Sequence, residues 1–129
     1  MHAVGVELLP RPQHALSDGE LVTLLVGVGL ELLDRHASGV PFGPLHPAHL
    51  AIDDRGRPCL RPVTAPPQWT PHDDWVALLR LGRVLGASDR AALLSHHEVD
   101  GRQAVELLRW LLEWAEPRSL TASTLATAR

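Results

Sequence analysis

The chain has 129 residues, of which 45% are apolar and 21% are charged, and it carries a formal net charge of -3. This length and balance predict one globular domain with a modest hydrophobic core, and they exclude a long-range electrostatic attraction to nucleic acid or an anionic membrane. All 12 basic side chains are Arg, and the sequence contains neither Lys nor Asn. Chemistry that needs a Lys amine or an Asn amide is therefore excluded.

The cysteine content and the apolar runs bear on the compartment. Cys59 is the only cysteine, which excludes an intramolecular disulfide, and we expect its thiol to be buried in a protein of the reducing cytoplasm. The most apolar run, residues 21–33, includes Thr, Glu and two Gly and is too short to span a bilayer. No signal-peptide pattern opens the chain. We therefore expect a cytoplasmic location without membrane insertion.

The first predicted element is a short strand. Residues 3–9 are mostly apolar and are closed by Pro10 and Pro12, which disfavour helix. We expect an edge strand here, followed by a linker to residue 16.

A long helix is predicted to begin after Ser17. Ser17 and Glu20 have the spacing of a capping box, and the apolar residues that follow recur at helical spacing over a broad face, which is typical of a central buried helix. Gly27 and Gly29 each lower helix stability by about 1 kcal/mol relative to Ala, so we expect close helix-helix contact at these positions. Gly39 predicts the end of the helix as a left-handed cap.

A small β-hairpin is predicted next. Residues 50–52 and 58–60 are short extended candidates on either side of a turn-rich acidic connector. We interpret Asp53 and Asp54 in that connector as solvated turn carboxylates rather than as a catalytic pair.

The second half of the chain predicts three helices. Thr70 caps the first of these, with Pro71 at its first helical position. Ser88 begins the second, which is short and ends near residue 97, and the third runs over residues 100–116. Residues 119–129 predict a frayed helix or a loose tail.

Residues 42–60 carry the most informative pattern. Protein kinases have H-R-D-L-x-x-x-N at their catalytic loop, and their small-molecule relatives have H-G-D-L-H-P-x-N, followed by a strand, an acidic turn ending in Gly and a second strand. This chain resembles that frame at Gly43, Leu45, His46, Pro47, Leu50, Ile52 and Gly56.

The departures from this frame fall where the family performs its chemistry. Pro44 stands at the catalytic base, His49 at the metal-binding Asn and Phe42 at the leading His, while Pro62 replaces the magnesium-binding Asp of D-F-G. Hard oxygen ligands for magnesium are missing from both metal-holding positions. We therefore expect no enzymatic activity, no binding of ATP-magnesium and no cofactor.

Two scaffold positions of the family are kept. Asp74 matches the Asp that opens the buried core helix of kinases, and the resemblance implies that it accepts hydrogen bonds from the backbone of the loop. His36 matches a packed structural His near the end of the family's long helix.

The resemblance implies a domain organisation. Residues 1–116 resemble a single kinase large lobe (C-lobe) without the small lobe, mainly α-helical with a small hairpin at about residues 50–60. Within it, residues 1–16 correspond to a hinge-like strand and linker and residues 17–116 to the helical core. Residues 117–129 form a C-terminal tail.

These observations lead to one functional hypothesis. We expect a catalytically inactive kinase-like remnant, a pseudokinase, that acts as a regulatory or scaffolding module by binding another protein or by self-association. A missing small lobe exposes the apolar side chains of Val4, Val6 and Leu9, which we expect to form an interaction surface. Trp110 and Trp114, four residues apart on the last helix, favour core packing, with an exposed partner-binding ridge as the alternative.

Two other hypotheses stay open. His46 and His49 lie three residues apart and are weak candidates for metal ligands, so the chain is alternatively a small ligand- or metal-binding protein or enzyme that reuses the loop. An unrelated helical adaptor is the third reading, and it predicts no hairpin beside the first long helix.

Overall fold

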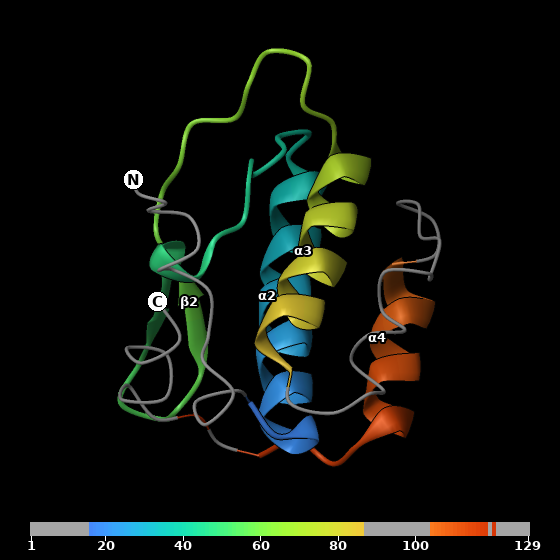
Figure 1. Ribbon diagram of the computed structural model, residues 1–129. Coiled ribbons are helices and arrows are strands. Elements are labelled where there is room, and N and C mark those ends of the chain that lie inside the picture. The colour runs from blue at the N-terminus through green and yellow to red at the C-terminus, as the bar shows by residue number, and fades with distance from the viewer. Residues whose placement is uncertain (1–15, 87–103, 119, 121–129) are drawn as a thin grey trace.

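The structure is a computed structural model, and it describes residues 16–86, 104–118 and 120. Three α-helices and a two-stranded antiparallel sheet make up these residues, with the long first helix between the hairpin on one side and the last helix on the other (Figure 1). The predicted class, mainly helical with a small hairpin, is confirmed. The elements are α2 (Asp18–Ala37), η2 (Pro47–His49), β1 (Leu50–Ile52), β2 (Pro58–Leu60), α3 (Pro71–Leu85) and α4 (Ala104–Trp114).

Both ends of α2 are formed by the predicted caps. The Ser17 hydroxyl accepts a 3.3 Å hydrogen bond from the Glu20 amide, and the Glu20 carboxylate accepts a 3.0 Å bond from the Ser17 amide. At the other end Gly39 has a φ of 78°, and its amide donates to the His36 carbonyl oxygen at 2.9 Å. The Val40 amide donates to the Arg35 carbonyl oxygen at 3.3 Å, which completes a Schellman motif.

The two glycines of α2 let different elements approach the helix. A Cβ atom on Gly29 would lie 2.5 Å from Leu108 Cδ2 of α4, which is the close helix-helix contact that we expected. A Cβ atom on Gly27 would lie 2.5 Å from Cγ of Pro58. The prediction of a helix-helix contact is therefore wrong at Gly27, because the neighbour there is the ring of a strand residue.

The hairpin has the predicted bounds. Leu50 pairs with Leu60, and Ile52 pairs with Pro58. Cys59 is only partly buried and not buried as expected, because successive strand residues face opposite sides and it is Pro58 that packs on α2. The third reading, an adaptor without this hairpin, is thereby wrong.

The acidic turn of the hairpin is held by its own backbone. Oδ1 of Asp53 accepts hydrogen bonds from the amides of Arg55 and Arg57, each at 2.9 Å. The Arg57 amide is the main cause of a lowered pKa of the Asp53 carboxyl group. Asp54 is exposed. Both acids thus have the structural role that we predicted.

The hydrophobic core lies between α2, α3 and α4. Trp75 and Leu78 of α3 and Leu111 of α4 are fully inaccessible to solvent. Trp114 is buried as well, and the half-buried ring of Trp110 stacks on it with 6.0 Å between ring centroids. Core packing therefore accounts for these aromatic side chains, and the alternative of an exposed tryptophan ridge is wrong.

The chain after α4 folds back on the start of α2. We expected α4 to reach residue 116, but it ends at Trp114. The Arg118 amide donates to the Gly19 carbonyl oxygen at 3.0 Å and to Oγ1 of Thr23 at 2.7 Å, and Leu120 is buried. The prediction of a loose tail over residues 119–129 is thus wrong at Leu120, and the preceding Arg118 is held by polar groups of the first two turns of α2.

Several predictions fall outside the described residues. They are the strand at 3–9, the helix from Ser88 to about residue 97, the start of the last helix at residues 100–103, and the tail at residues 119 and 121–129. At the border of this region Leu16 is buried, and its amide donates to the Leu85 carbonyl oxygen at 2.7 Å. No helix within the described part of the chain is both long and apolar enough to cross a membrane.

Candidate functional site

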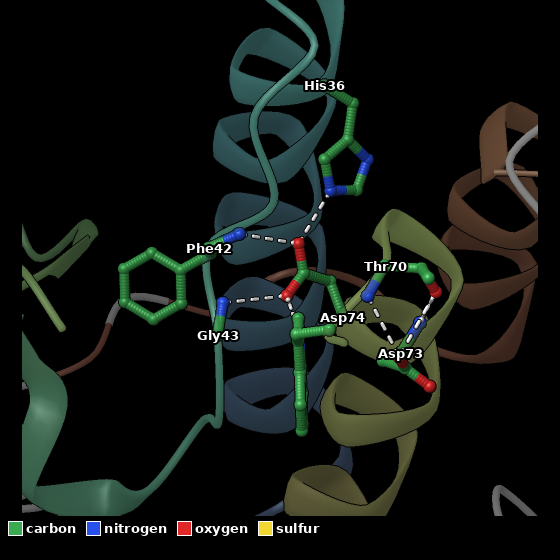
Figure 2. Close-up of polar contacts among 7 residues, drawn as sticks. His36, Phe42, Gly43, Thr70, Asp73 and Asp74 are labelled. Atoms are coloured by element: carbon green, nitrogen blue, oxygen red, sulfur yellow. Dashed lines mark hydrogen bonds and ion pairs between the residues drawn. The ribbon is translucent and has the colours of Figure 1, made fainter. Parts of the chain in front are cut away.

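One carboxylate holds the loop that follows α2. Asp74 is completely buried, and its Oδ2 atom accepts hydrogen bonds from the Phe42 amide at 2.8 Å and from Nε2 of His36 at 2.7 Å (Figure 2). Its Oδ1 atom accepts from the Gly43 amide at 2.9 Å and from Nε1 of Trp69 at 2.8 Å. The backbone bonds to Phe42 and Gly43 are those that the resemblance to kinases implies for this Asp.

The first turn of α3 places Asp74 in the core. Thr70 caps the helix, and its hydroxyl accepts from the Asp73 amide at 3.3 Å while the Asp73 carboxylate accepts from the Thr70 amide at 2.9 Å. Pro71 occupies the first turn, where its missing amide hydrogen costs nothing. This reciprocal cap fixes the direction of the helix, so the following residue, Asp74, points inward toward the loop (Figure 2).

The geometry around Asp74 is suited to support rather than to chemistry. A carboxylate has about four acceptor positions, and four donors use them. Two backbone amides and an indole can only donate, so both oxygens act as acceptors and the His36 ring donates through Nε2. No acceptor position is left for a metal ion or a substrate proton.

His36 acts as a packed partner of this carboxylate. It lies in the last turn of α2, and its side chain is only 13% exposed. Its ring meets the ring of Trp75 edge to face, with 5.6 Å between centroids. The structural role that we predicted for His36 agrees with these contacts.

The loop itself is built from a buried aromatic residue and a glycine. Phe42 is buried, and the Arg35 guanidinium lies 4.9 Å above its ring. Gly43 has a φ of 120°, and a Cβ atom there would lie 3.2 Å from Cα of Ala65. A side chain at residue 43 would therefore be strained in conformation and crowded in space.

Two histidines shape the second half of the loop. Nδ1 of His46 accepts a 3.1 Å hydrogen bond from the Ala48 amide and so caps η2. Nδ1 of His49 lies 3.2 Å from the Pro44 carbonyl oxygen, to which it can only donate. The two rings meet edge to face with 5.9 Å between centroids. Partial burial, and then the proximity of His49, lower the pKa of His46.

The other positions at which the chain departs from the kinase frame add no metal ligand to His46 and His49. Pro62 is exposed beyond the end of β2. Within residues 16–86 and 104–118, no group of three His, Cys, Asp or Glu side chains is placed to hold a metal ion. Val4, Val6 and Leu9 lie outside the described residues.

A groove of about 400 Å³ lies between the loop and α3. Prolines and a leucine of the loop form one wall, and the outer face of α3 forms the other. Trp69 lies at the groove as well and so joins it to Asp74. The lining residues are Pro44, Leu45, His46, Pro47, Trp69, Asp73, Val76, Ala77, Arg80, Leu81 and Val84.

The sequence-based predictions missed Trp69 and Arg80. Val76, Arg80 and Val84 follow one another at four-residue intervals, and this spacing predicts that they share one face of the helix. Nothing in the local sequence around Trp69 indicates that its indole reaches Asp74. That contact depends on how the segment before α3 crosses the loop.

Comparisons with known proteins give little guidance on this site. No family model and no solved structure matches the chain. The chain is 31% identical over 87 residues to a UPF0282 protein of Pyrobaculum aerophilum. The match covers 67% of this chain but only 29% of that protein, so the chain spans less than a third of the length of its relative.

Proposed function

We propose that the chain is a catalytically inactive, protein kinase-like large-lobe module that acts as a regulator or scaffold through contacts with another protein or with a second copy. The observation that carries this proposal is the set of hydrogen bonds by which Asp74 holds the backbone of Phe42 and Gly43. The order of elements agrees with it, because a capped long helix, a loop, a hairpin and an Asp-bearing helix follow one another as the kinase resemblance requires.

The loop supports an inactive module. Pro44 has no side-chain base, and Pro62 has no side-chain ligand. His49, at the metal-binding position, uses Nδ1 in a hydrogen bond to the Pro44 carbonyl oxygen. Magnesium prefers oxygen ligands, and none of these three side chains offers one. In this proposal the frame keeps its shape while phosphoryl transfer is lost, and the module works in the cytoplasm.

Calorimetric titration with ATP-magnesium tests the inactive assignment. We expect no heat of binding at micromolar protein concentrations, and thermal unfolding should be unchanged by millimolar nucleotide. Magnesium alone and ATP alone serve as matched controls. Micromolar affinity for ATP-magnesium would reject the proposal.

The interaction role needs a separate experiment. Light scattering coupled to size-exclusion chromatography measures self-association of the purified chain, and affinity capture from the native host identifies candidate partners. A captured protein counts only if the two purified proteins re-form the complex. A monomer without any reconstituted partner would contradict a scaffolding function.

The runner-up is a small ligand- or metal-binding protein that uses His46 and His49. The metal version requires at least one more ligand than the pair provides within the described residues. The ligand version is favoured by the groove beside His46. Replacing His46 by Ala should abolish binding in that case, whereas it should leave a protein interaction elsewhere on the surface unchanged.

A further inference from the structure

The groove between the loop and α3 has mostly apolar walls and a few polar side chains. Seven of its lining residues are Pro, Leu, Val or Ala. Its polar side chains are those of His46, Asp73, Arg80 and Trp69. Small-molecule sites have this composition, with mostly apolar walls and few polar groups, and they start at about 300 Å³.

Two side chains of the groove, Arg80 and His46, offer hydrogen-bond donors to a ligand. Arg80 is exposed, and it forms no hydrogen bond or ion pair with another residue in the part of the chain that the structure describes. His46 accepts from the Ala48 amide through Nδ1, so the neutral ring carries its hydrogen on Nε2 and offers a second donor. Partial burial and the neighbouring His49 lower the pKa of His46, which favours this neutral ring.

The Asp73 carboxylate, which is the acidic group of the groove, is partly used by the cap of α3, through its Oδ2 atom. The Asp73 carboxylate accepts from the Thr70 amide at 2.9 Å and from the Thr70 hydroxyl at 3.1 Å. Asp73 and Arg80 are seven residues apart on one helix, which separates their backbones by about 10 Å along the axis. Asp73 and Arg80 form no ion pair, so the guanidinium keeps its donors for a ligand. The Trp69 indole donates to Asp74 and is not available to a ligand.

We propose that this groove binds a small organic carboxylate with an apolar body. The carboxylate accepts from the Arg80 guanidinium, which matches its planar geometry, and from Nε2 of His46. The apolar body lies between the proline-rich wall of the loop and Val76 and Ala77 of α3. This site is independent of the kinase-like proposal, because it depends only on the groove and its donors.

Hexanoate is a suitable probe, with hexanamide and hexylamine as matched compounds of the same length. Binding to the full chain is followed by amide chemical shifts in two-dimensional NMR spectra. We expect saturable binding of hexanoate with a Kd of about 1 mM or lower. Hexanamide and hexylamine should bind at least about tenfold more weakly, because each lacks the negative charge.

Substitutions on the two walls locate the site. Arg80→Gln should weaken hexanoate binding about tenfold and leave hexanamide binding unchanged. Arg83→Gln is the matched control, since Arg83 is exposed on the same helix but does not line the groove. His46→Asn keeps an acceptor for the Ala48 amide while it removes the Nε2 donor, and it should weaken hexanoate binding by a smaller factor.

The outcomes separate clearly. Shifted amides should cluster at residues 44–47 and 73–84, and the thermal unfolding of both Arg variants should match that of the original chain. Absence of saturable hexanoate binding, equal binding of hexylamine, or equal losses in the Arg80 and Arg83 variants would each overturn the proposal. None of these results bears on whether the chain binds ATP-magnesium.

Discussion

Nε2 of His36 donates a 2.7 Å hydrogen bond to Oδ2 of Asp74, and this bond joins the last turn of α2 to the first turn of α3. The same carboxylate also holds the loop between these helices through the amides of Phe42 and Gly43. The path of the chain across the candidate site therefore depends on one buried acidic side chain.

Replacing Asp74 by Asn should destabilise the fold by about 3 kcal/mol, because the new amide group turns two hydrogens toward donors that are buried and lose their acceptor. Urea unfolding measures the change. The matched control is Asp73→Asn, which affects only the exposed helix cap and should cost about 1 kcal/mol. Equal losses for the two variants would show that Asp74 has no special role in holding the loop.

Replacing Gly27 by Ala should destabilise the protein by about 1–3 kcal/mol although Ala favours helix, because the new methyl group would overlap the rigid ring of Pro58. Gly29→Ala meets the tip of a flexible leucine, Leu108, and should cost less. Thermal unfolding compares the two. A stabilised Gly27→Ala variant would contradict the tight contact between α2 and β2.

Replacing Leu120 by Ala should lower the free energy of unfolding by about 2 kcal/mol, since this side chain is 3% exposed. Leu30→Ala is the same substitution at a position that is 56% exposed, and it should change stability by less than about 0.5 kcal/mol. Chemical denaturation provides both values. If the Leu120 variant is as stable as the Leu30 variant, residue 120 contributes nothing to the core.

The stability of the loop should depend on the protonation of His46. Its pKa is lowered in the folded protein, so between the folded value and the ordinary value of about 6.5 the unfolded chain binds more protons. Stability is therefore retained above that ordinary value and falls as the pH decreases below it. Protonation of Nδ1 also removes the acceptor for the Ala48 amide.

Urea midpoints at pH 7.5 and pH 5.0 test this dependence. His46→Asn should show a smaller loss of stability between the two pH values than the original chain, because Asn caps η2 without titrating. His72→Asn is the control, since His72 is exposed on α3. An unchanged pH dependence in the His46 variant would contradict the proposed effect.

Local elements were predictable because their signals act over a few residues. The cap at Ser17 and Glu20, the left-handed Gly39, the hairpin bounds and the start of α3 at Thr70 all appear where the sequence indicates them. In each case the interacting groups lie close in the chain, at most ten positions apart as for Leu50 and Leu60, so the pattern of residue types is sufficient.

The candidate site was predictable only in part. Resemblance to kinases pointed to Asp74 and to the backbone of the loop, and both were found together. It did not indicate Trp69, nor the groove with Arg80, because the kinase motifs do not specify these positions. The kinase-like ancestry itself stays a proposal.

The amino-acid sequence alone determined both ends of α2, the bounds of the hairpin and the start of α3, and it excluded the chemistry of Lys and Asn side chains. Only the tertiary structure decided that Asp74 meets His36, 38 positions away, that Arg118 returns to Thr23 across 95 positions, and that Pro58 rather than a helix covers Gly27. The physical reason is that such contacts depend on the packing of whole elements against one another. A pattern of neighbouring residues predicts an element, but it does not predict which other element that one packs against.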